Sequence, residues 1–397
     1  MGDLVSTLEC QRPEKLLMNR RFKLLYFVSE DWYFCSHRLP LAQAAKEAGF
    51  DVVVVTRVRD HGEVIRRAGL RLVPCEWSRR GLNPFRELVV LAKLWRIYRR
   101  EQPDIVHQVA LKPVLYGTLA AWFAGCGRVV NAVAGLGFIF ISSRKRARLL
   151  RPLVRMALRW LLDRPGSRLI LQNRDDVEQF IQEKLADPEK IILIRGSGVD
   201  LTRFVPEPER PEPLVVLLAS RLLWDKGVGE FVEAARRLRN QGANARFVLV
   251  GDGDSENPAT IPRQQLAAWK EAGDIEWWGR RDDMPQILGM AHIVCLPSYR
   301  EGLPKVLLEA AACARPLVAT DVPGCREIVR SGENGILVPV RDAVALAAAI
   351  ETLLGDPERR QQMGRVGRRM VEEGFAQEVV VDATMALYRE MMLCNGR

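Results

Sequence analysis

The stretch IVCLPSYREGLPKVLLEAAACARPLVAT, residues 293–320, contains a complete strand–loop–helix–strand unit. Its two ends, 293–297 and 317–320, are short apolar runs that predict buried strands, and 304–314 between them predicts a helix. Pro304 stands at the expected first position of that helix, where proline is well tolerated. Because a strand, a helix and a second strand in this order form a parallel unit, the stretch predicts an α/β fold.

The same alternation extends through the rest of the chain. Further strands are predicted at 23–28, 51–56, 70–74, 105–107, 129–132, 168–172, 214–220, 246–251 and 275–278. Amphipathic helical stretches separate most of them, including 37–48, 228–240 and 263–272. The first of these helices is expected to end at Gly49, a residue typical of helix C-termini. The pattern predicts parallel, doubly wound sheets.

Residues 206–213, PEPERPEP, divide this pattern in two. Four prolines in eight residues exclude a helix or a central strand and indicate a linker that acts as a hinge. A chain of 397 residues also suits two domains rather than one. We therefore expect a tail at 1–21, a Rossmann-like domain at 22–205, a second at 206–375 and a terminal helix at 376–397.

The net charge of +10 lies in the first half of the chain. Residues 1–200 contain 34 Lys and Arg against 21 Asp and Glu, a net charge of +13, whereas the remainder carries −3. This asymmetry indicates an anionic partner for the first half. The basic amphipathic stretch 142–164, supported by 88–100, predicts contact with an anionic membrane surface. Alternatively, 142–164 is a domain helix with a solvated basic face.

The sequence lacks the features of several other classes of protein: nucleic-acid binders, proteins that span membranes, secreted proteins and zinc proteins. A nucleic-acid partner is not expected, because there is no recognition motif and no interleaving of exposed aromatic residues. No apolar run reaches the length of about 20 residues that a membrane span requires, and 1–20 contains no apolar leader. The eight cysteines are scattered, which is typical of reduced thiols and argues against zinc. We expect a cytoplasmic protein, peripheral on the cytoplasmic face of the inner membrane.

Charged residues gather where two predicted strands end. Arg221 and Lys226 follow 214–220, and two cations at such an edge suit a diphosphate. Glu301 precedes the helix 304–314 and Glu309 lies inside it, and the start of a helix is itself suited to a phosphate. Taken alone, each pair could equally be ordinary surface charges. Together, at the carboxyl ends of parallel strands, they predict a ligand site.

These residues also resemble a known family. Arg221, Lys226, the runs LVGDG at 249–253 and WWGRRDDMP at 277–285, and the E-x7-E pair Glu301 and Glu309 resemble family 4 of the glycosyltransferases, which have the GT-B fold. The segments SEDWYFCSHRLPLA (29–42), LKPVLYGTLAA (111–121), NAVAGLGFIF (131–140), LQNRDDVEQF (171–180) and GSGVDLTRF (196–204) are similar to bacterial enzymes that build lipid-linked oligosaccharides or O-antigen. The resemblance covers roughly residues 22–390.

The resemblance implies a function and a division of labour. The implied activity is retaining transfer of a hexose or N-acetylhexosamine from a UDP-sugar to a polyprenyl-diphosphate-linked saccharide, in surface polysaccharide or glycan assembly. The second domain would bind the nucleotide sugar, the first would bind the acceptor, and the terminal helix would cross back to the first. Two alternatives remain open: a GT-B nucleotide-sugar 2-epimerase and a non-catalytic membrane-docking scaffold.

Residue roles follow from the same resemblance. Arg221 and Lys226 would bind the diphosphate and, with Glu301, would be catalytic. The further donor-binding residues would be Arg280, Gly302, Leu303, Pro304 and Glu309, of which Glu309 would bind the ribose hydroxyls. The residues expected to face the cleft from the acceptor side are Ser29, Glu30, Asp31, His37, His107, Lys112, Gly135 and Gly137. For His107, which ends a predicted strand, a structural hydrogen-bonding role remains the alternative.

Two departures from the family pattern and one metal motif need separate mention. SEDW at 29–32 replaces a Gly-rich loop, and Val109 stands where some relatives carry a second His, so a His-mediated contact to the donor sugar is in doubt. Asp252 and Asp254 form a DxD pattern, which can hold a metal in another transferase fold. Here the pattern is predicted to be a turn, and no cofactor or metal is expected.

Overall fold

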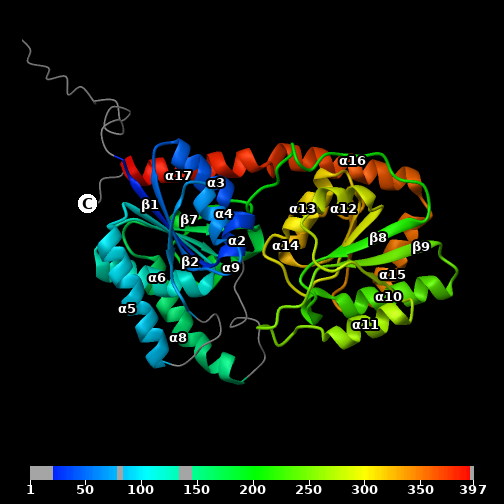
Figure 1. The fold of residues 1–397 in the computed structure, drawn as a ribbon, viewed down its shortest axis with the longest axis horizontal. Helices are drawn as coiled ribbons and strands as arrows, with labels where there is room; N and C mark the ends of the chain where they lie inside the picture. Colours follow the sequence, from blue (N-terminus) through cyan, green and yellow to red (C-terminus); the bar gives the residue numbers. More distant parts are fainter. Residues whose placement is uncertain (1–20, 78–83, 134–144, 394–397) are drawn as a thin grey trace, which may run out of the picture.

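The computed structural model describes residues 21–77, 84–133 and 145–393. They form two α/β domains that lie side by side, each with one parallel sheet between layers of helices (Figure 1). The α/β class and the two doubly wound sheets predicted from the sequence are confirmed.

The first sheet has seven strands in the order β3-β2-β1-β4-β5-β6-β7. The strands are β1 (Lys23–Glu30), β2 (Asp51–Arg57), β3 (Arg71–Pro74), β4 (Ile105–Val109), β5 (Val129–Val133), β6 (Ser167–Leu171) and β7 (Ile191–Leu193). The helices around it are α2 (Asp31–His37), α3 (Leu39–Glu47), α4 (Gly62–Arg67), α5 (Pro84–Glu101), α6 (Leu111–Ala124), α8 (Lys145–Leu162) and α9 (Arg174–Gln182), with a short 3-10 turn, η1 (Pro188–Lys190).

The second sheet has six strands in the order β10-β9-β8-β11-β12-β13. They are β8 (Leu214–Ala219), β9 (Ala245–Val250), β10 (Glu276–Trp277), β11 (Ile293–Leu296), β12 (Leu317–Thr320) and β13 (Gly335–Val338). The helices are η2 (Trp224–Lys226), α10 (Val228–Asn240), α11 (Arg263–Glu271), α12 (Met284–Met290), α13 (Lys305–Ala312), α14 (Pro323–Arg326), α15 (Ala343–Leu354), α16 (Pro357–Gly374) and α17 (Gln377–Leu393).

Burial on both faces explains why the strands are continuous apolar runs. Along β1, Tyr26 packs into the core beneath α3 and α17, whereas its neighbours Leu25 and Phe27 pack into the core beneath α5. The same alternation divides β8 between two cores. A strand covered on both faces needs apolar residues at every position, which is the pattern of parallel sheets in doubly wound folds.

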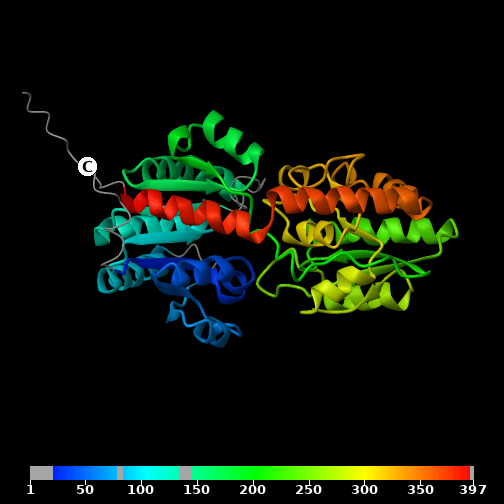
Figure 2. The ribbon, with the colours of Figure 1, turned by 90° about the horizontal axis from the view of Figure 1, so that it is seen from above.

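The terminal helix crosses from the second domain to the first. Helix α16 covers the second domain, and α17 continues from it over the first (Figure 2). The crossing is tied by backbone hydrogen bonds, because Val199 N donates to Phe375 O at 3.0 Å and Gln377 N donates to Val199 O at 3.0 Å. Gly198 adopts a φ of +70°, and a Cβ there would lie 2.5 Å from Gln377 Cα. The chain thus passes between the domains twice, near Val199 and near Ala376, and these two segments are in contact.

The proline-rich segment 206–213 is not a free hinge. Arg360, which is buried, donates to both carboxylate oxygens of Glu209 at 3.1 and 3.0 Å. Arg315, also buried, donates to Glu207 O at 2.9 Å. Buried guanidiniums need such partners, so they attach the segment to the second domain. The chain has already joined the core of the second domain before this segment, since Val199 and Phe204 pack there.

Two local predictions also need correction. The predicted helix 37–48 is two helices, because the chain becomes helical at Asp31 and breaks at Arg38 between α2 and α3. Pro304 lies just before α13 rather than inside it, with an extended ψ of 110°. Among the described residues, no helix combines the length and the apolarity needed to cross a membrane.

A buried polar cluster joins α17 to the first sheet and can be tested. The Tyr388 hydroxyl lies 3.1 Å from that of Tyr26 and bonds His107 Nδ1. Tyr388→Phe leaves these buried groups without that partner, which should lower the free energy of amide exchange in β1 and β4 by about 1–3 kcal/mol. Native-state hydrogen exchange measures it. Tyr299→Phe, the same change in the second domain, is the control, and unaltered exchange in β1 would contradict the prediction.

Candidate functional site

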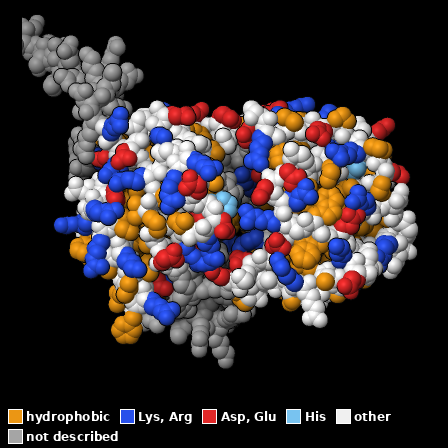
Figure 3. Space-filling model, in the orientation of Figure 1, with side chains coloured by type: hydrophobic (Ala, Val, Ile, Leu, Met, Phe, Trp, Pro, Cys, Tyr) orange, Lys and Arg blue, Asp and Glu red, His pale blue; other side chains and the backbone are white. Residues whose placement is uncertain are grey.

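A cleft lies between the two domains, at the carboxyl edges of both sheets. Its larger part has a volume of about 900 Å³ and its inner part about 360 Å³, and they share Trp32, His37, Ser220, Arg221 and Lys305 among their lining residues. Figure 3 shows a hollow between the domains, bordered by Lys and Arg side chains. The arrangement matches the place where ligands bind in open α/β sheets.

The loop after β8 brings Arg221 and Lys226 to the cleft. This loop packs against the backbone of the loops after β9 and β11, and two glycines with positive φ allow the close approach. A Cβ at Gly227, which has a φ of +71°, would lie 2.0 Å from Pro297 O, and one at Gly251, which has a φ of +131°, would lie 1.9 Å from Ser220 O. Only glycine permits such a close approach at positive φ. These residues bring the loops after β8, β9 and β11 together.

Both cations are paired with carboxylates. Lys226 Nζ donates to Glu301 Oε1 at 2.5 Å, and these two side chains are 19% and 11% exposed. Arg221 Nη1 donates to Asp254 Oδ2 at 3.0 Å. Of the residues predicted for donor binding, Arg221, Lys226 and Glu301 therefore converge. Their charges are balanced in pairs, and a more highly charged anion would compete with each carboxylate for its cation.

The start of α13 forms the floor of the inner cleft. Gly302, Leu303 and Pro304 line it, as predicted from the sequence. The first domain helps to fix this segment, because Asn173 Nδ2 donates to Gly302 O at 2.8 Å and Lys305 Nζ donates to Ser36 O at 2.8 Å. The floor of the site is thus held by contacts from both domains.

Glu309 and Arg280 line the outer part of the cleft. Glu309 is largely buried and lies 3.5 Å from Lys305 Nζ. Burial raises the pKa of Glu309, and the Lys305 ammonium offsets part of this rise. Arg280 is exposed and lies 3.7 Å from Asp282. The cleft therefore has one largely buried carboxylate, Glu309, and one exposed guanidinium, Arg280, in this part of its lining.

The wall contributed by the first domain includes Trp32 and His37. His37 stacks on Tyr33 with ring centroids 4.2 Å apart, and its buried Nδ1 has no hydrogen-bond partner among the described residues. Burial, followed by the nearby Lys305 and Arg38 charges, lowers the pKa of His37 to about 3. His37 is therefore neutral at physiological pH.

Of the three residues predicted to face the cleft in segment 29–31, one lines it and two do not. Glu30 lines the cleft. Asp31 is completely buried, and its carboxylate accepts the backbone N–H groups of Arg59 at 2.6 Å and His61 at 2.9 Å. Ser29 accepts a hydrogen bond from Trp77 Nε1 through its carbonyl. Neither Asp31 nor Ser29 lines the cleft, so their predicted contact with a substrate is corrected to the support of neighbouring loops.

Two other predicted cleft residues are elsewhere. His107 lies in the middle of β4 rather than at its end, is completely buried, and bonds Tyr388 of α17. Burial lowers its pKa, so it is a neutral core residue. Lys112 Nζ bonds Glu87 at 2.8 Å and lies over the rings of Trp77 and Tyr116, away from the cleft lining. Gly135 and Gly137 fall outside the described residues.

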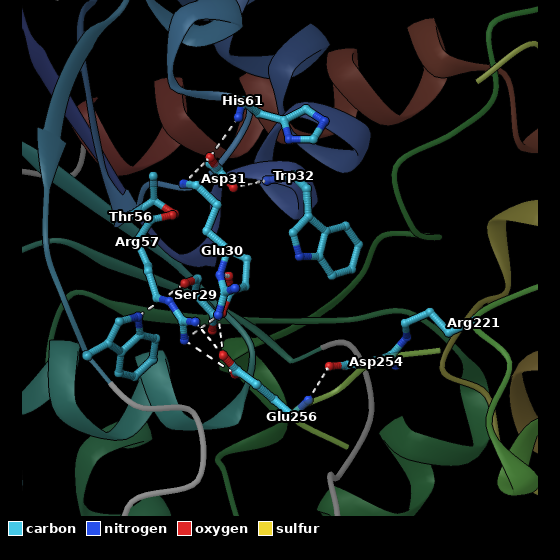
Figure 4. Close-up of polar contacts among 12 residues, drawn as sticks. Ser29, Glu30, Asp31, Trp32, Thr56, Arg57, His61, Arg221, Asp254 and Glu256 are labelled. Carbon is cyan, nitrogen blue, oxygen red and sulfur yellow. Dashed lines mark hydrogen bonds and ion pairs between the residues drawn. The ribbon is translucent and has the colours of Figure 1, made fainter. Parts of the chain in front are cut away.

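Two residues that line the cleft, Arg59 and Glu256, and their neighbour Arg57 were not predicted from the sequence. Arg57 and Arg59, at the end of β2, converge on Glu256, which lies beyond β9 in the second domain (Figure 4). A signal existed, because Arg57 directly follows the predicted strand 51–56 and strand ends face the cleft. Glu256 carried no such signal, since only tertiary structure brings its turn to the first domain.

The DxD pattern does not form a cluster of metal ligands. Asp254 pairs with Arg221, and its other carboxylate oxygen accepts the backbone N–H of Glu256 at 3.2 Å. Across the described ranges, no group of three or more His, Cys, Asp or Glu side chains is arranged to hold a metal ion. The turn is built around an Asp–Arg pair.

Comparison with known proteins identifies both halves. A family model described as "Glycosyl transferase 4-like" matches residues 23–172, and one described as "Glycosyl transferases group 1" matches 213–356. The chain is 31% identical over 341 residues to the N,N'-diacetylbacillosaminyl-diphospho-undecaprenol alpha-1,3-N-acetylgalactosaminyltransferase of Campylobacter jejuni, covering 83% of this chain and 88% of that protein. It is 28% identical to the UDP-Gal:alpha-D-GlcNAc-diphosphoundecaprenol alpha-1,3-galactosyltransferase of Escherichia coli, covering 79% and 82%.

A solved structure confirms the fold. The crystal structure of HepE from Anabaena in complex with UDP and glucose superposes with a TM-score of 0.74 at 18% identity, covering 93% of this chain and 99% of that one. The GT-B architecture predicted from the motifs is confirmed by such neighbours, and the family resemblance is confirmed by the sequence matches. The chain therefore belongs to the family 4 glycosyltransferases.

Proposed function

We propose that this glycosyltransferase moves a hexose or N-acetylhexosamine, with retention of configuration, from a UDP-sugar to a polyprenyl-diphosphate-linked saccharide in surface polysaccharide or glycan assembly. The observation that carries the proposal is the convergence of Arg221, Lys226 and Glu301 with the start of α13 in one interdomain cleft. In this proposal the second domain binds the donor and the first domain binds the acceptor.

The names of the relatives support the substrate classes. The Campylobacter and Escherichia enzymes are named for acceptors linked to diphospho-undecaprenol, and the second is also named for UDP-galactose. Both relatives match most of this chain, including the first domain. We extend a UDP-sugar donor and a polyprenyl-diphosphate acceptor to this chain on that basis.

The ion pairs in the cleft suggest how the donor would be held. Its diphosphate would displace Asp254 from Arg221 and take a share of Lys226 from Glu301. The fork of Arg221 and the point charge of Lys226 complement the two phosphates. Glu301 would then be available for hydroxyls of the donor sugar, and Glu309 for those of the ribose. Arg280 lies at the outer end of this path, where the nucleobase would extend.

The chemical step would need no covalent intermediate on the protein. The acceptor hydroxyl attacks the anomeric carbon on the face from which the diphosphate leaves. The bond from that carbon to the diphosphate oxygen breaks, and the leaving oxygen takes the acceptor's proton. Arg221 and Lys226 stabilise the charge that develops on the leaving group, which is often the largest catalytic contribution. His37 lines the cleft in its neutral form, so it adds no cation that would compete for the diphosphate.

A lipid-linked acceptor requires the enzyme to reach a membrane, and one face of the first domain suits this. Trp95 of α5, Trp122 and Phe123 of α6 and Trp160 of α8 are all partly exposed. They form a connected group, which we call the aromatic face. The rings of Trp122 and Trp160 lie 5.0 Å apart, and Trp95 Nε1 donates to Phe123 O at 3.2 Å.

Arginine side chains stack on rings of the aromatic face, and helix α5 exposes further cations. Arg164 lies over the rings of Trp122 and Trp160, at 4.5 and 5.0 Å. Lys93, Arg96 and Arg99 are exposed on α5. Figure 3 shows hydrophobic and basic side chains together over the part of the first domain where Figure 1 places α5. Exposed aromatic rings beside cations suit the interface of an anionic membrane, so we propose peripheral docking through this face, on the cytoplasmic side of the inner membrane.

The donor cations can be tested by substitution. Arg221→Ala and Lys226→Ala each remove a charge-assisted hydrogen bond of about 1.5–3 kcal/mol. Each variant should therefore lower turnover by about tenfold or more, measured as release of UDP in the presence of lipid-linked acceptor. Arg237→Ala, which removes an exposed cation from α10, is the matched control. Near-normal turnover in both variants would exclude these residues from diphosphate binding.

The reaction and its independence of metal can be tested together. Purified protein should move radiolabelled sugar from one member of a panel of UDP-hexoses and UDP-N-acetylhexosamines to polyprenyl-diphosphate saccharides in a bacterial lipid extract, with EDTA present. Transfer that stops in EDTA and returns with Mn²⁺ would contradict the metal-free proposal and implicate Asp252 and Asp254. Conversion of the UDP-sugar without acceptor would indicate an epimerase, and transfer from no donor would contradict the proposed function.

The docking face can be tested with vesicles. Reversing Lys93, Arg96 and Arg99 to Glu should abolish cosedimentation with vesicles of anionic phospholipid at low salt, since each well-placed cation contributes about 1 kcal/mol. Affinity for UDP should be unchanged, because these residues are outside the cleft. The control reverses three exposed cations of α16: Arg359, Arg365 and Arg369. Equal vesicle binding by the two triple variants would argue against docking through α5.

A further inference from the structure

Arg57 and Arg59 of the first domain share the carboxylate of Glu256 in the second domain, and Arg59 and Glu256 line the outer part of the cleft. Figure 4 shows Arg57 beside Glu256. Arg57 Nη2 lies 2.5 Å and Nη1 lies 3.4 Å from the two oxygens of Glu256, and Arg59 Nη2 also bonds Glu256. Two guanidiniums converging on one anionic group is a geometry that suits phosphate as well as carboxylate. The donor residues Arg221, Lys226 and Glu301 belong to the opposite domain.

The two arginines also have contacts within their own domain. Glu30, which is buried, lies 3.5 Å from a guanidinium nitrogen of each. The Asp31 carboxylate fixes the loop that carries Arg59 by accepting its backbone N–H at 2.6 Å. Arg57 is only 14% exposed, so its side chain has little freedom. Contacts within the first domain therefore restrict both guanidiniums in addition to their bonds with Glu256.

Charge favours an anion at this position. Within the first domain, the two guanidiniums share only the carboxylate of Glu30 as an ion-pair partner among the described contacts, since the Asp31 carboxylate is taken up by backbone N–H groups. Glu256 adds a second carboxylate from the other domain, where its backbone N–H is held by Asp254. The contact consequently forms only while the domains are close together, and Glu256 can be replaced at the arginines by an anion of higher charge.

We propose that Arg57 and Arg59 bind the diphosphate of the lipid-linked acceptor, and that Glu256 occupies their place until the acceptor displaces it. This inference rests on the proposed function, which supplies an acceptor that carries a diphosphate. The saccharide attached to that diphosphate would extend into the cleft toward Trp32 and His37, which line the wall of the first domain. The donor and acceptor diphosphates would then be bound by different domains.

The experiment uses farnesyl diphosphate, a short polyprenyl diphosphate, titrated calorimetrically into the full chain after the donor cations have been saturated with UDP. Glu256→Gln keeps the shape of the side chain and removes the competing charge, so it should tighten binding by about fivefold or more. Arg59→Gln leaves Arg57 to pair with Glu30 and should weaken binding by about tenfold. Arg66→Gln, an exposed arginine of α4, is the matched control and should change affinity by less than twofold.

The two substitutions should change the affinity for farnesyl diphosphate in opposite directions, and this distinguishes a binding site from a simple contact between domains. A contact that only holds the domains together would be lost equally in Glu256→Gln and Arg59→Gln, and the two variants would shift affinity in the same direction, which would overturn the inference. A loss of UDP affinity in Arg59→Gln would also overturn it, by assigning the arginines to the donor. Failure of the unmodified protein to bind UDP would instead contradict the proposed function, and titration without UDP would still compare the signs of the two variants.

Discussion

Every strand in both sheets runs parallel to its neighbours, which places all carboxyl ends of a sheet at one edge. The residues that follow β1, β2, β8, β9 and β11 therefore meet in one cleft, although they are spread over more than half of the chain. Parallel order is in turn possible only because helices cover both faces and the strands are apolar throughout. The position of the site is thus a consequence of the same burial that stabilises the sheets.

The charged groups of the cleft are arranged in balanced pairs. Lys226 is neutralised by Glu301, Arg221 by Asp254, and Arg57 with Arg59 by Glu256 and Glu30. Unpaired charges in a partly buried cleft would carry a large desolvation penalty, so each cation needs a partner when no ligand is bound. An anionic ligand can enter by replacing a carboxylate, which avoids exposing a bare charge at any stage.

The junction between the domains combines fixed and adjustable contacts. Val199 bonds the chain on either side of Ala376, and buried Arg315 and Arg360 hold the proline-rich segment on the second domain. These contacts localise the crossing to a short region. Arg326 of the second domain also pairs with Asp175 of the first, and both side chains are partly exposed. Exposed pairs contribute little stability, so the backbone bonds at Val199 and the buried arginines define this junction more than such pairs do.

The sequence by itself determined the α/β class, the two sheets, the family and the gathering of residues such as Arg221, Lys226 and Glu301 at one edge of the second sheet, because these depend on local patterns and on motifs within single loops. It misplaced His107 and Lys112, whose surroundings depend on α17 and α5, and it could not reveal that Glu256 meets Arg57. Local periodicity reports which face of an element is apolar, whereas the partner of a polar side chain depends on how distant segments pack. Only the tertiary structure decided which charges face one another across the cleft.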